Sequence, residues 1–356
     1  MKKFKINIFA FLLLLLAVIL TVYSQRAAEY AKSALDLCAV SIIPSLFPYM
    51  VVSSMIVSSG IGFIPGKLIP VSRLFSLPDC STSAILLGAL CGFPVGAKTA
   101  VSLYTNGYIT KDETEILISA SNNTGPSFVV FVIGGVFFGS TAFGWYLYIF
   151  QLISSLFSAL LVNRVIFGVK KYENKKYKKE LRFPDIFRAV SDSATSVITV
   201  CAFIVFFCVI QGFLLPALSK LSPDIAGLVS ALLEFTNGAR TASAIGGPKG
   251  MFLAGLSVGW SGLSVFFQTL SFTSPCDISL KRTVAVKALQ GILCGMLTMI
   301  LAPERTFESG EAYTPAVSDA SVLSLSHIST VTIICFLLLL SIVSLLLKKK
   351  KKHLDL

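Results

Sequence analysis

The sequence predicts an all-α polytopic membrane protein, with about eight transmembrane helices and two re-entrant hairpins in two inverted-topology repeats. Three observations predict this class. Of the 356 residues, 54% are hydrophobic and only 13% are charged, whereas soluble domains carry about 25% charged residues. Ten apolar segments come close to the length of about 20 residues that crosses a bilayer as a helix. The stretch FPVGAKTA at 93–100 recurs as FTNGARTA at 235–242.

The ten apolar segments are separated by short polar or basic stretches. They cover residues 7–23, 38–63, 84–104, 115–138, 142–168, 196–217, 226–246, 250–272, 284–302 and 328–347. The first segment follows MKKFK and is short, so a cleaved signal peptide is the alternative to the uncleaved anchor that we expect.

Basic clusters give the orientation of the chain. They stand at the N-terminus, at 170–182 and at 348–352, and the positive-inside rule places all three in the cytoplasm. Five apolar segments separate each consecutive pair of clusters, and an odd number of crossings cannot return the chain to the same side. One segment in each group of five must therefore enter and leave by the same face.

The two segments that carry the repeated motif, 84–104 and 226–246, are the predicted re-entrant hairpins. Both are rich in small residues, and irregular backbone at membrane depth is tolerated only inside protein or beside a wet cavity. Helix-breaking residues mark the predicted turns and hinges of these hairpins and of the polar-interrupted spans that follow them. They are Gly92, Pro94, Gly96, Gly125, Pro126, Gly238, Gly259 and Gly262.

The repeat predicts the domain organisation. TGPS at 124–127 pairs with SGLS at 261–264, in the same order as the two hairpin motifs. We expect an anchor helix with an external segment (1–37), a first repeat (38–168) and a basic cytoplasmic linker with an amphipathic helix (169–195). A second repeat (196–302), an external acidic loop (303–327) and a transmembrane helix with a basic cytoplasmic tail (328–356) follow.

Several chemistries are excluded by composition. The eight cysteines form no C-x-x-C pair, only two histidines occur, and no phosphate-binding GxxxxGK[ST] pattern is present. We therefore expect no metal, no cofactor, no catalytic residues and no enzymatic turnover. The net charge of +12 lies mostly in the basic clusters at span ends, which indicates a lipid bilayer rather than nucleic acid as the partner.

The stretches GALCGFPVGAKTA and NGYITKDETEILISASNNTGPSFVVFVIGGVFFG resemble the sporulation integral membrane protein YlbJ (SpoVV) family. That family belongs to the nucleoside-recognition Gate domain, which is similar to concentrative nucleoside transporters. The resemblance runs from about residue 38 to 300. It implies export of dipicolinic acid from the mother cell across the outer forespore membrane during sporulation, and a homo-oligomer. The linker at 170–195 is shorter than in the family, which puts regulatory features there in doubt.

Two cations inside the motif are candidate ligands for an anion. Lys98 and Arg240 occupy matched places in the two repeats, and a charge at mid-bilayer is costly. The hypothesis is that both face one central cavity and bind the carboxylates of a small organic dianion. The alternative is that each extends to the interface or pairs with an acid such as Glu234.

Polar residues at the interrupted spans complete the candidate substrate site. Pro126 and Gly125 predict unwinding of the helix, which exposes backbone amides to an anion. The candidate ligands are Asn122, Asn123, Thr124 and Ser127 in the first repeat, and Asn237, Trp260, Ser261 and Ser264 in the second. Trp260 is equally well explained as a packing anchor.

The predicted function is transport of a small organic anion, most simply the dipicolinate that the family resemblance implies. A nucleoside or other metabolite permease of the same fold is one alternative, and a non-transporting spore-envelope assembly protein is another. The plasma membrane or the outer forespore membrane is the expected location, with both termini in the cytoplasm.

Overall fold

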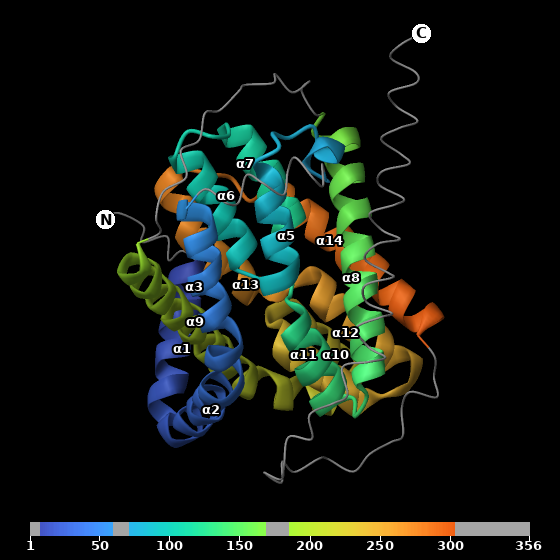
Figure 1. Cartoon of the computed structure of the whole chain (residues 1–356). Coiled ribbons are helices and arrows are strands. Elements are labelled where there is room, and N and C mark those ends of the chain that lie inside the picture. The colour runs from blue at the N-terminus through green and yellow to red at the C-terminus, as the bar shows by residue number, and fades with distance from the viewer. Residues whose placement is uncertain (1–7, 60–70, 169–184, 303–356) are drawn as a thin grey trace, which may run out of the picture.

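The computed structural model describes residues 8–59, 71–168 and 185–302, and every regular element in these ranges is a helix (Figure 1). The predicted C-terminal span at 328–347 and the acidic loop at 303–327 lie outside the described residues. Two runs of elements follow the same order: a long helix, a pair of short helices, an interrupted helix and a final long helix.

The first unit occupies residues 24–166. Its long helix is formed by α2 (Ser24–Leu37), a π-helical turn η1 (Cys38–Ile42) and α3 (Ile43–Ser59). A short turn η3 (Val71–Phe75) precedes the helix pair α5 (Ser81–Cys91) and α6 (Val95–Thr105). The interrupted helix comprises α7 (Lys111–Ser121) and the π-helical η4 (Ser127–Phe137). The unit ends with α8 (Thr141–Leu161) and η5 (Val162–Ile166).

The second unit repeats this order. Its long helix is α9 (Ile186–Leu221), and its helix pair is α10 (Pro223–Leu233) and α11 (Phe235–Ile245). The interrupted helix comprises α12 (Gly247–Trp260) and α13 (Gly262–Thr273), and a turn η6 (Ser274–Cys276) leads to α14 (Lys281–Leu301). The shared order of elements agrees with the repeat that the sequence indicates.

The paired helices are too short to cross a bilayer. Each of α5, α6, α10 and α11 has 11 residues, which at about 1.5 Å per residue is roughly half of a hydrocarbon core of about 30 Å. Four helical segments in the described ranges are long and apolar enough to span: Thr141–Ile166, Ile186–Lys220, Gly247–Cys276 and Lys281–Leu301. A bent pair in α1–α2 raises this to five. Eight complete spans are therefore not established.

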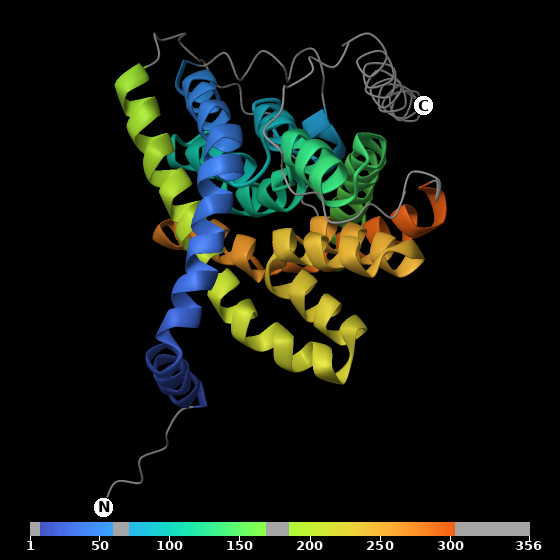
Figure 2. The same ribbon diagram turned by 90° about the horizontal axis from the view of Figure 1, so that it is seen from below.

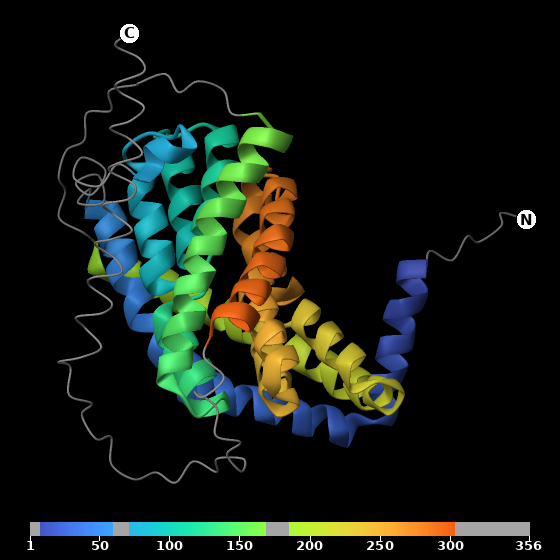
Figure 3. The ribbon, with the colours of Figure 1, turned by 90° about the vertical axis from the view of Figure 1, so that its right-hand side faces the viewer.

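Two segments differ from the sequence prediction. The expected external segment within 27–37 is helical, because α2 continues without interruption into η1 and α3. The α1 helix (Ile8–Val22) is bent from α2 by 96° and stands apart from the helical body (Figure 3). Residues Ile186 and Phe187, expected on a separate amphipathic helix, form the first turn of α9, which Asp185 caps by accepting from the Arg188 amide at 3.0 Å.

The two units pack against each other mainly through α14, which lies against α7 and α8 of the first unit. In Figure 2, α12 and α14 form a layer with the helices of the first unit on one side and the α10–α11 pair on the other. Within this layer glycines let α12 and α14 approach closely, since a Cβ at Gly255 would lie 2.6 Å from the carbonyl oxygen of Cys294. Helices in membrane proteins are expected to pack in this way, because small residues let their backbones approach closely.

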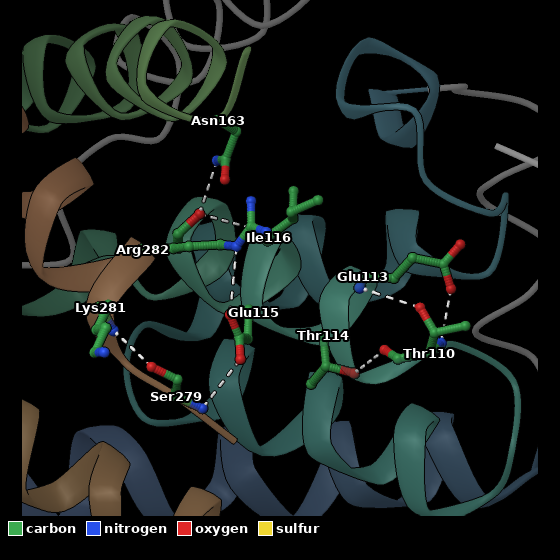
Figure 4. Close-up of polar contacts among 10 residues, drawn as sticks. Thr110, Glu113, Thr114, Glu115, Ile116, Asn163, Ser279, Lys281 and Arg282 are labelled. Atoms are coloured by element: carbon green, nitrogen blue, oxygen red, sulfur yellow. Dashed lines mark hydrogen bonds and ion pairs between the residues drawn. The ribbon is translucent and has the colours of Figure 1, made fainter. Parts of the chain in front are cut away.

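A polar clasp joins the start of α7 to the loop before α14 (Figure 4). Thr110 and Glu113 form a reciprocal capping box that begins α7. One helical turn later, Glu115 accepts from the Ser279 amide at 3.2 Å and from Arg282 Nε at 3.3 Å. Both side chains of this ion pair are only 13% exposed, so the clasp is largely shielded from water.

A second ion pair beside the clasp is solvent-exposed. Lys111 Nζ lies 2.7 Å from Asp277 Oδ2, and this hydrogen bond lowers the pKa of the Asp277 carboxyl while it raises the pKa of Lys111. The Asp277 side chain is fully exposed, and exposed ion pairs contribute little to stability. The two ion pairs therefore differ mainly in burial.

This difference gives a test of the clasp. We expect Arg282→Met to lower the free energy of unfolding by about 1.5–3 kcal/mol, because it leaves Glu115 without its charged donor. Lys111→Met is the matched control and should change it by less than about 1 kcal/mol. Thermal unfolding in detergent measures both, and equal losses in the two variants would contradict a stabilising role for the clasp.

Candidate functional site

The two hairpin turns meet in the centre of the protein. Phe93 follows α5, Phe235 begins α11, and their rings pack edge to face with centroids 5.0 Å apart. Phe128, on the first turn of η4, packs against Phe235 at 5.3 Å. The repeated motif therefore brings the turns of the two units into direct contact.

The first turn lies against the first helix interruption. Gly92 has φ +81°, and a Cβ there would overlap the backbone nitrogen of Gly125. A Cβ at Gly125 would in turn lie 3.1 Å from the carbonyl group of Cys91. Two stretches of irregular backbone thus touch directly, and only glycine fits at the contact.

The second turn lies against the second interruption in the same way. Ser261 (φ 73°) and Gly262 (φ 79°) both have left-handed backbone between α12 and α13. A Cβ at Gly262 would lie 2.9 Å from Glu234 Cα and from the nitrogen of Phe235. In each unit, therefore, the hairpin turn is in direct contact with the helix interruption that follows it.

Glu234 satisfies the backbone of the second turn. Its carboxylate accepts from the amides of Thr236 at 3.1 Å and Asn237 at 2.8 Å, at the N-terminus of α11. The residue is fully buried. An anionic cap suits the positive end of a helix dipole, so Glu234 is engaged with backbone and is not a partner of either motif cation.

A small cavity of ≈ 20 Å³ lies where the turns and the first interruption converge. Its wall is apolar except for Thr124, Ser127 and Gln268; the other lining residues are Ile42, Leu46, Phe93, Gly125, Phe128, Val200, Ile204 and Phe235. Thr124 Oγ1 and Gln268 Oε1 are buried and have no hydrogen-bond partner within the described part of the chain. Buried polar atoms without partners are costly. A cavity of this volume holds about one water molecule, so in this conformation its wall suits a polar group of that size.

Three other predicted ligands form hydrogen bonds inside the protein, although Asn122 Oδ1 has no partner among the described residues. Asn122 donates to Thr269 Oγ1 at 3.0 Å, and the Ser264 hydroxyl accepts from Gln268 at 3.2 Å. Ser261 donates to the carbonyl of Val258 at 3.4 Å. All three residues are buried and none of them lines the cavity, so their hydrogen bonds hold the interrupted helices in place.

Trp260 and Asn237 lie away from the central cavity. Trp260 donates from Nε1 to the carbonyl of Leu232 at 3.0 Å and packs against Phe266 with centroids 4.8 Å apart. These contacts support the packing-anchor interpretation. Asn237 donates to Cys208 Sγ at 3.1 Å and lines a different cavity, described below.

Three of the predicted hinge glycines lie inside helices. Gly96 is within α6, Gly238 within α11 and Gly259 within α12, each with helical backbone. A Cβ at Gly259 would lie 2.8 Å from the carbonyl of Gln290, and one at Gly96 would overlap the carbonyl of Ser121. Their role in this structure is close helix packing. Pro94 and Pro126 do precede helix starts, at α6 and η4.

Lys98 and Arg240 do not share one cavity. Half-buried Lys98 donates to the Asp192 carbonyl at 3.0 Å and to Ser196 Oγ at 2.7 Å, near the start of α9. Arg240 lies near Gln211 of the same helix, about four turns further on. The two cations therefore lie beside different parts of α9, although they occupy matched places in the repeated motif.

Arg240 lines a larger cavity of ≈ 310 Å³ between α2, α9 and α11. Its lining is rich in hydroxyl and amide groups and contains no acid: Tyr30, Ser33, Ala34, Leu37, Phe137, Cys208, Gln211, Gly212, Leu215, Pro216, Thr236, Asn237, Arg240 and Thr241. Arg240 is exposed and forms no ion pair with the residues described. The cavity therefore has positive charge and polar donors.

The sequence interpretation missed a buried lysine. Lys287 of α14 is 1% exposed, and its Nζ donates to Asn123 Oδ1 at 3.0 Å and to Gln290 Oε1 at 2.9 Å. Gln290 Nε2 also donates to Asn123 Oδ1 at 3.0 Å. The available signal was a lysine and a glutamine one turn apart inside an apolar span, which by itself marks a functional hypothesis in a membrane helix.

The apolar helices and their polar, interrupted centre define an integral membrane protein. The chain is a distant homologue of the sporulation integral membrane protein YlbJ of Bacillus subtilis (strain 168), with 25% identity over 346 residues that cover 85% of this chain and 84% of that protein. This relative supports the family resemblance carried by GFPVGAK and NNTGP. No protein-family model matches the sequence, and no solved structure matches it.

The contact between turn and interruption can be tested with glycine substitutions. Gly92→Ala adds both backbone strain and an overlap with Gly125, whereas Gly107→Ala adds strain alone, because Gly107 has φ +74° and open space around it. We expect Gly92→Ala to be less stable than Gly107→Ala by about 1–3 kcal/mol. Equal unfolding midpoints for the two variants in detergent would show that the contact is not tight.

Proposed function

We propose that this protein is a transporter for a small organic anion, which moves by alternating access between two inverted units without enzymatic turnover. The observation that carries the proposal is the meeting of two hairpin turns and two interrupted helices around one small cavity, whose apolar wall carries the polar groups of Thr124, Ser127 and Gln268. Interrupted helices in paired repeats are typical of secondary transporters with a site at mid-membrane. A scaffold protein would gain nothing from buried polar groups without partners.

The charges around this centre favour an anion. Lys287 contacts Asn123 of the first interruption. Lys98 and Arg240 follow the two hairpin turns on α6 and α11, and the carboxylate of Glu234 is occupied by backbone amides. Arg240 in particular lines a cavity that has no acid among its described lining residues. An arginine can bind a carboxylate through two parallel hydrogen bonds.

The two motif cations support the alternating mechanism. Lys98 is held by Asp192 and Ser196, whereas the matched Arg240 borders an open cavity. In inverted repeats, matched residues exchange environments when the transporter changes its facing side. Under this proposal the described conformation is open beside Arg240 and closed beside Lys98, and the opposite conformation frees Lys98.

The substrate that we propose is dipicolinate, exported across the outer forespore membrane during sporulation. Two arguments support it: the motif resemblance to the YlbJ family, and the distant relative whose name places it in sporulation. A planar molecule with two carboxylates suits a route with successive cations.

A neutral metabolite such as a nucleoside is the second candidate. One observation favours it, because the central cavity is lined by hydroxyl, amide and apolar groups and by no charged side chain. Competition between dipicolinate and nucleosides for flux in proteoliposomes separates the two candidates.

The role of Arg240 can be tested by efflux of dipicolinate from proteoliposomes. We expect Arg240→Ala to raise the KM roughly 10-fold or more, because it removes a charge-assisted hydrogen bond of about 1.5–3 kcal/mol. Lys249→Ala is the matched control: Lys249 is exposed and pairs with Asp224, so its loss removes one positive charge outside the cavity. If both variants raise the KM equally, Arg240 contributes only general electrostatic attraction.

The central cavity has its own test. Gln268→Leu and Thr124→Val keep the approximate size of each side chain and remove its polar atoms from the wall. We expect either variant to lower flux about 10-fold while the protein stays folded, since a bound polar ligand loses a partner. Normal flux in both variants would place the substrate route elsewhere.

A further inference from the structure

The hydrogen-bond partners of Lys287 are unusual for a buried cation. The ammonium contacts two uncharged oxygens, Asn123 Oδ1 and Gln290 Oε1, and within the described residues no carboxylate forms an ion pair with it. The nearby acid on α7, Glu115, is engaged by Arg282. Buried charges are normally paired, so the position must compensate the charge in another way.

The position of Lys287 supplies that compensation. Asn123 lies two residues beyond the end of α7, and its amide nitrogen donates to the carbonyl of Ala120 at 3.1 Å. The ammonium therefore sits at the C-terminal end of a half-helix, where the helix dipole is negative. Helix C-termini and neutral oxygens at unwound backbone are the environment that binds monovalent cations in transporters with interrupted helices.

The surrounding network is built to hold a cation in place. Gln290 donates to Asn123 Oδ1 and, at 3.3 Å, to the carbonyl of Gln151. Gln151 donates at 2.9 Å to the carbonyl of Thr124, a residue of the central cavity wall. The amides thus orient their oxygens toward Nζ and tie the ammonium to the first interruption.

We propose that the Lys287 ammonium is a tethered cation that fills a monovalent-cation site at the end of α7, so that no free Na⁺ or K⁺ is needed to hold the interruption. This role of Lys287 at the C-terminal end of α7 does not depend on which solute the protein transports. Removing the side chain should expose the oxygens of Asn123 and Gln290 to a free cation. An apolar side chain of similar length should fill the space without creating a site.

The test is thermal unfolding of the full chain in detergent, in NaCl, KCl and choline chloride at equal ionic strength. For Lys287→Ala we expect the unfolding midpoint to rise by about 2–4 °C in NaCl or KCl relative to choline chloride, as saturable binding of a small ligand predicts. The wild-type protein and Lys287→Met should have the same midpoint in all three salts. The unfolding midpoint does not depend on transport, so this test remains valid even if the protein shows no dipicolinate flux.

Three outcomes would overturn the proposal. The first is a Lys287→Ala variant with equal midpoints in the three salts, or one that is unfolded in all of them. The second is the same Na⁺ or K⁺ effect in Lys287→Met, which would make it a general salt effect. The third is a wild-type protein that Na⁺ or K⁺ stabilises specifically, which would mean that a free cation is still required.

Discussion

Interrupted backbone inside the protein is the constraint on which this structure depends. Lipid offers no hydrogen-bond partner, so every break in a helix at membrane depth must be satisfied by protein. Here each hairpin turn packs on the helix interruption of its own unit, through Gly92 and Gly125 in the first and through Glu234 and Gly262 in the second. Side chains then supply hydrogen bonds that the interrupted helices cannot form: the Glu234 carboxylate accepts from backbone amides, and the Gln151 amide donates to the carbonyl of Thr124.

This constraint also creates the site. Backbone can approach backbone so closely only where side chains are absent, and the glycines at the contacts leave polar atoms grouped around a small space. Within the described residues, Thr124 and Gln268 retain buried polar atoms without partners there, while Lys287 donates to Asn123 of the first interruption. The polar groups that stabilise the interrupted backbone are therefore also the groups that can bind a solute in the central cavity.

The sequence predicted the interruptions better than their consequences. Glycine and proline at 92–96 and 125–126 indicate broken helices because their backbone preferences are local. The contact between Phe93 and Phe235 and the separation of Lys98 from Arg240 are tertiary, because both depend on how the two units pack against each other. A lysine inside an apolar span is a signal of function that was overlooked, whereas the contacts of Lys287 with Asn123 and Gln290 are visible only in the folded chain.

The most direct measurement of the central idea is whether the two turns must part for a solute to pass. A Phe93→Cys, Phe235→Cys double variant, in a background without the native cysteines, can be joined by a short bifunctional thiol reagent that reductant removes. The account predicts that cross-linking stops dipicolinate flux in proteoliposomes, that reduction restores it, and that neither single-cysteine variant responds. Flux that continues unchanged through the cross-linked protein would contradict a route between the turns.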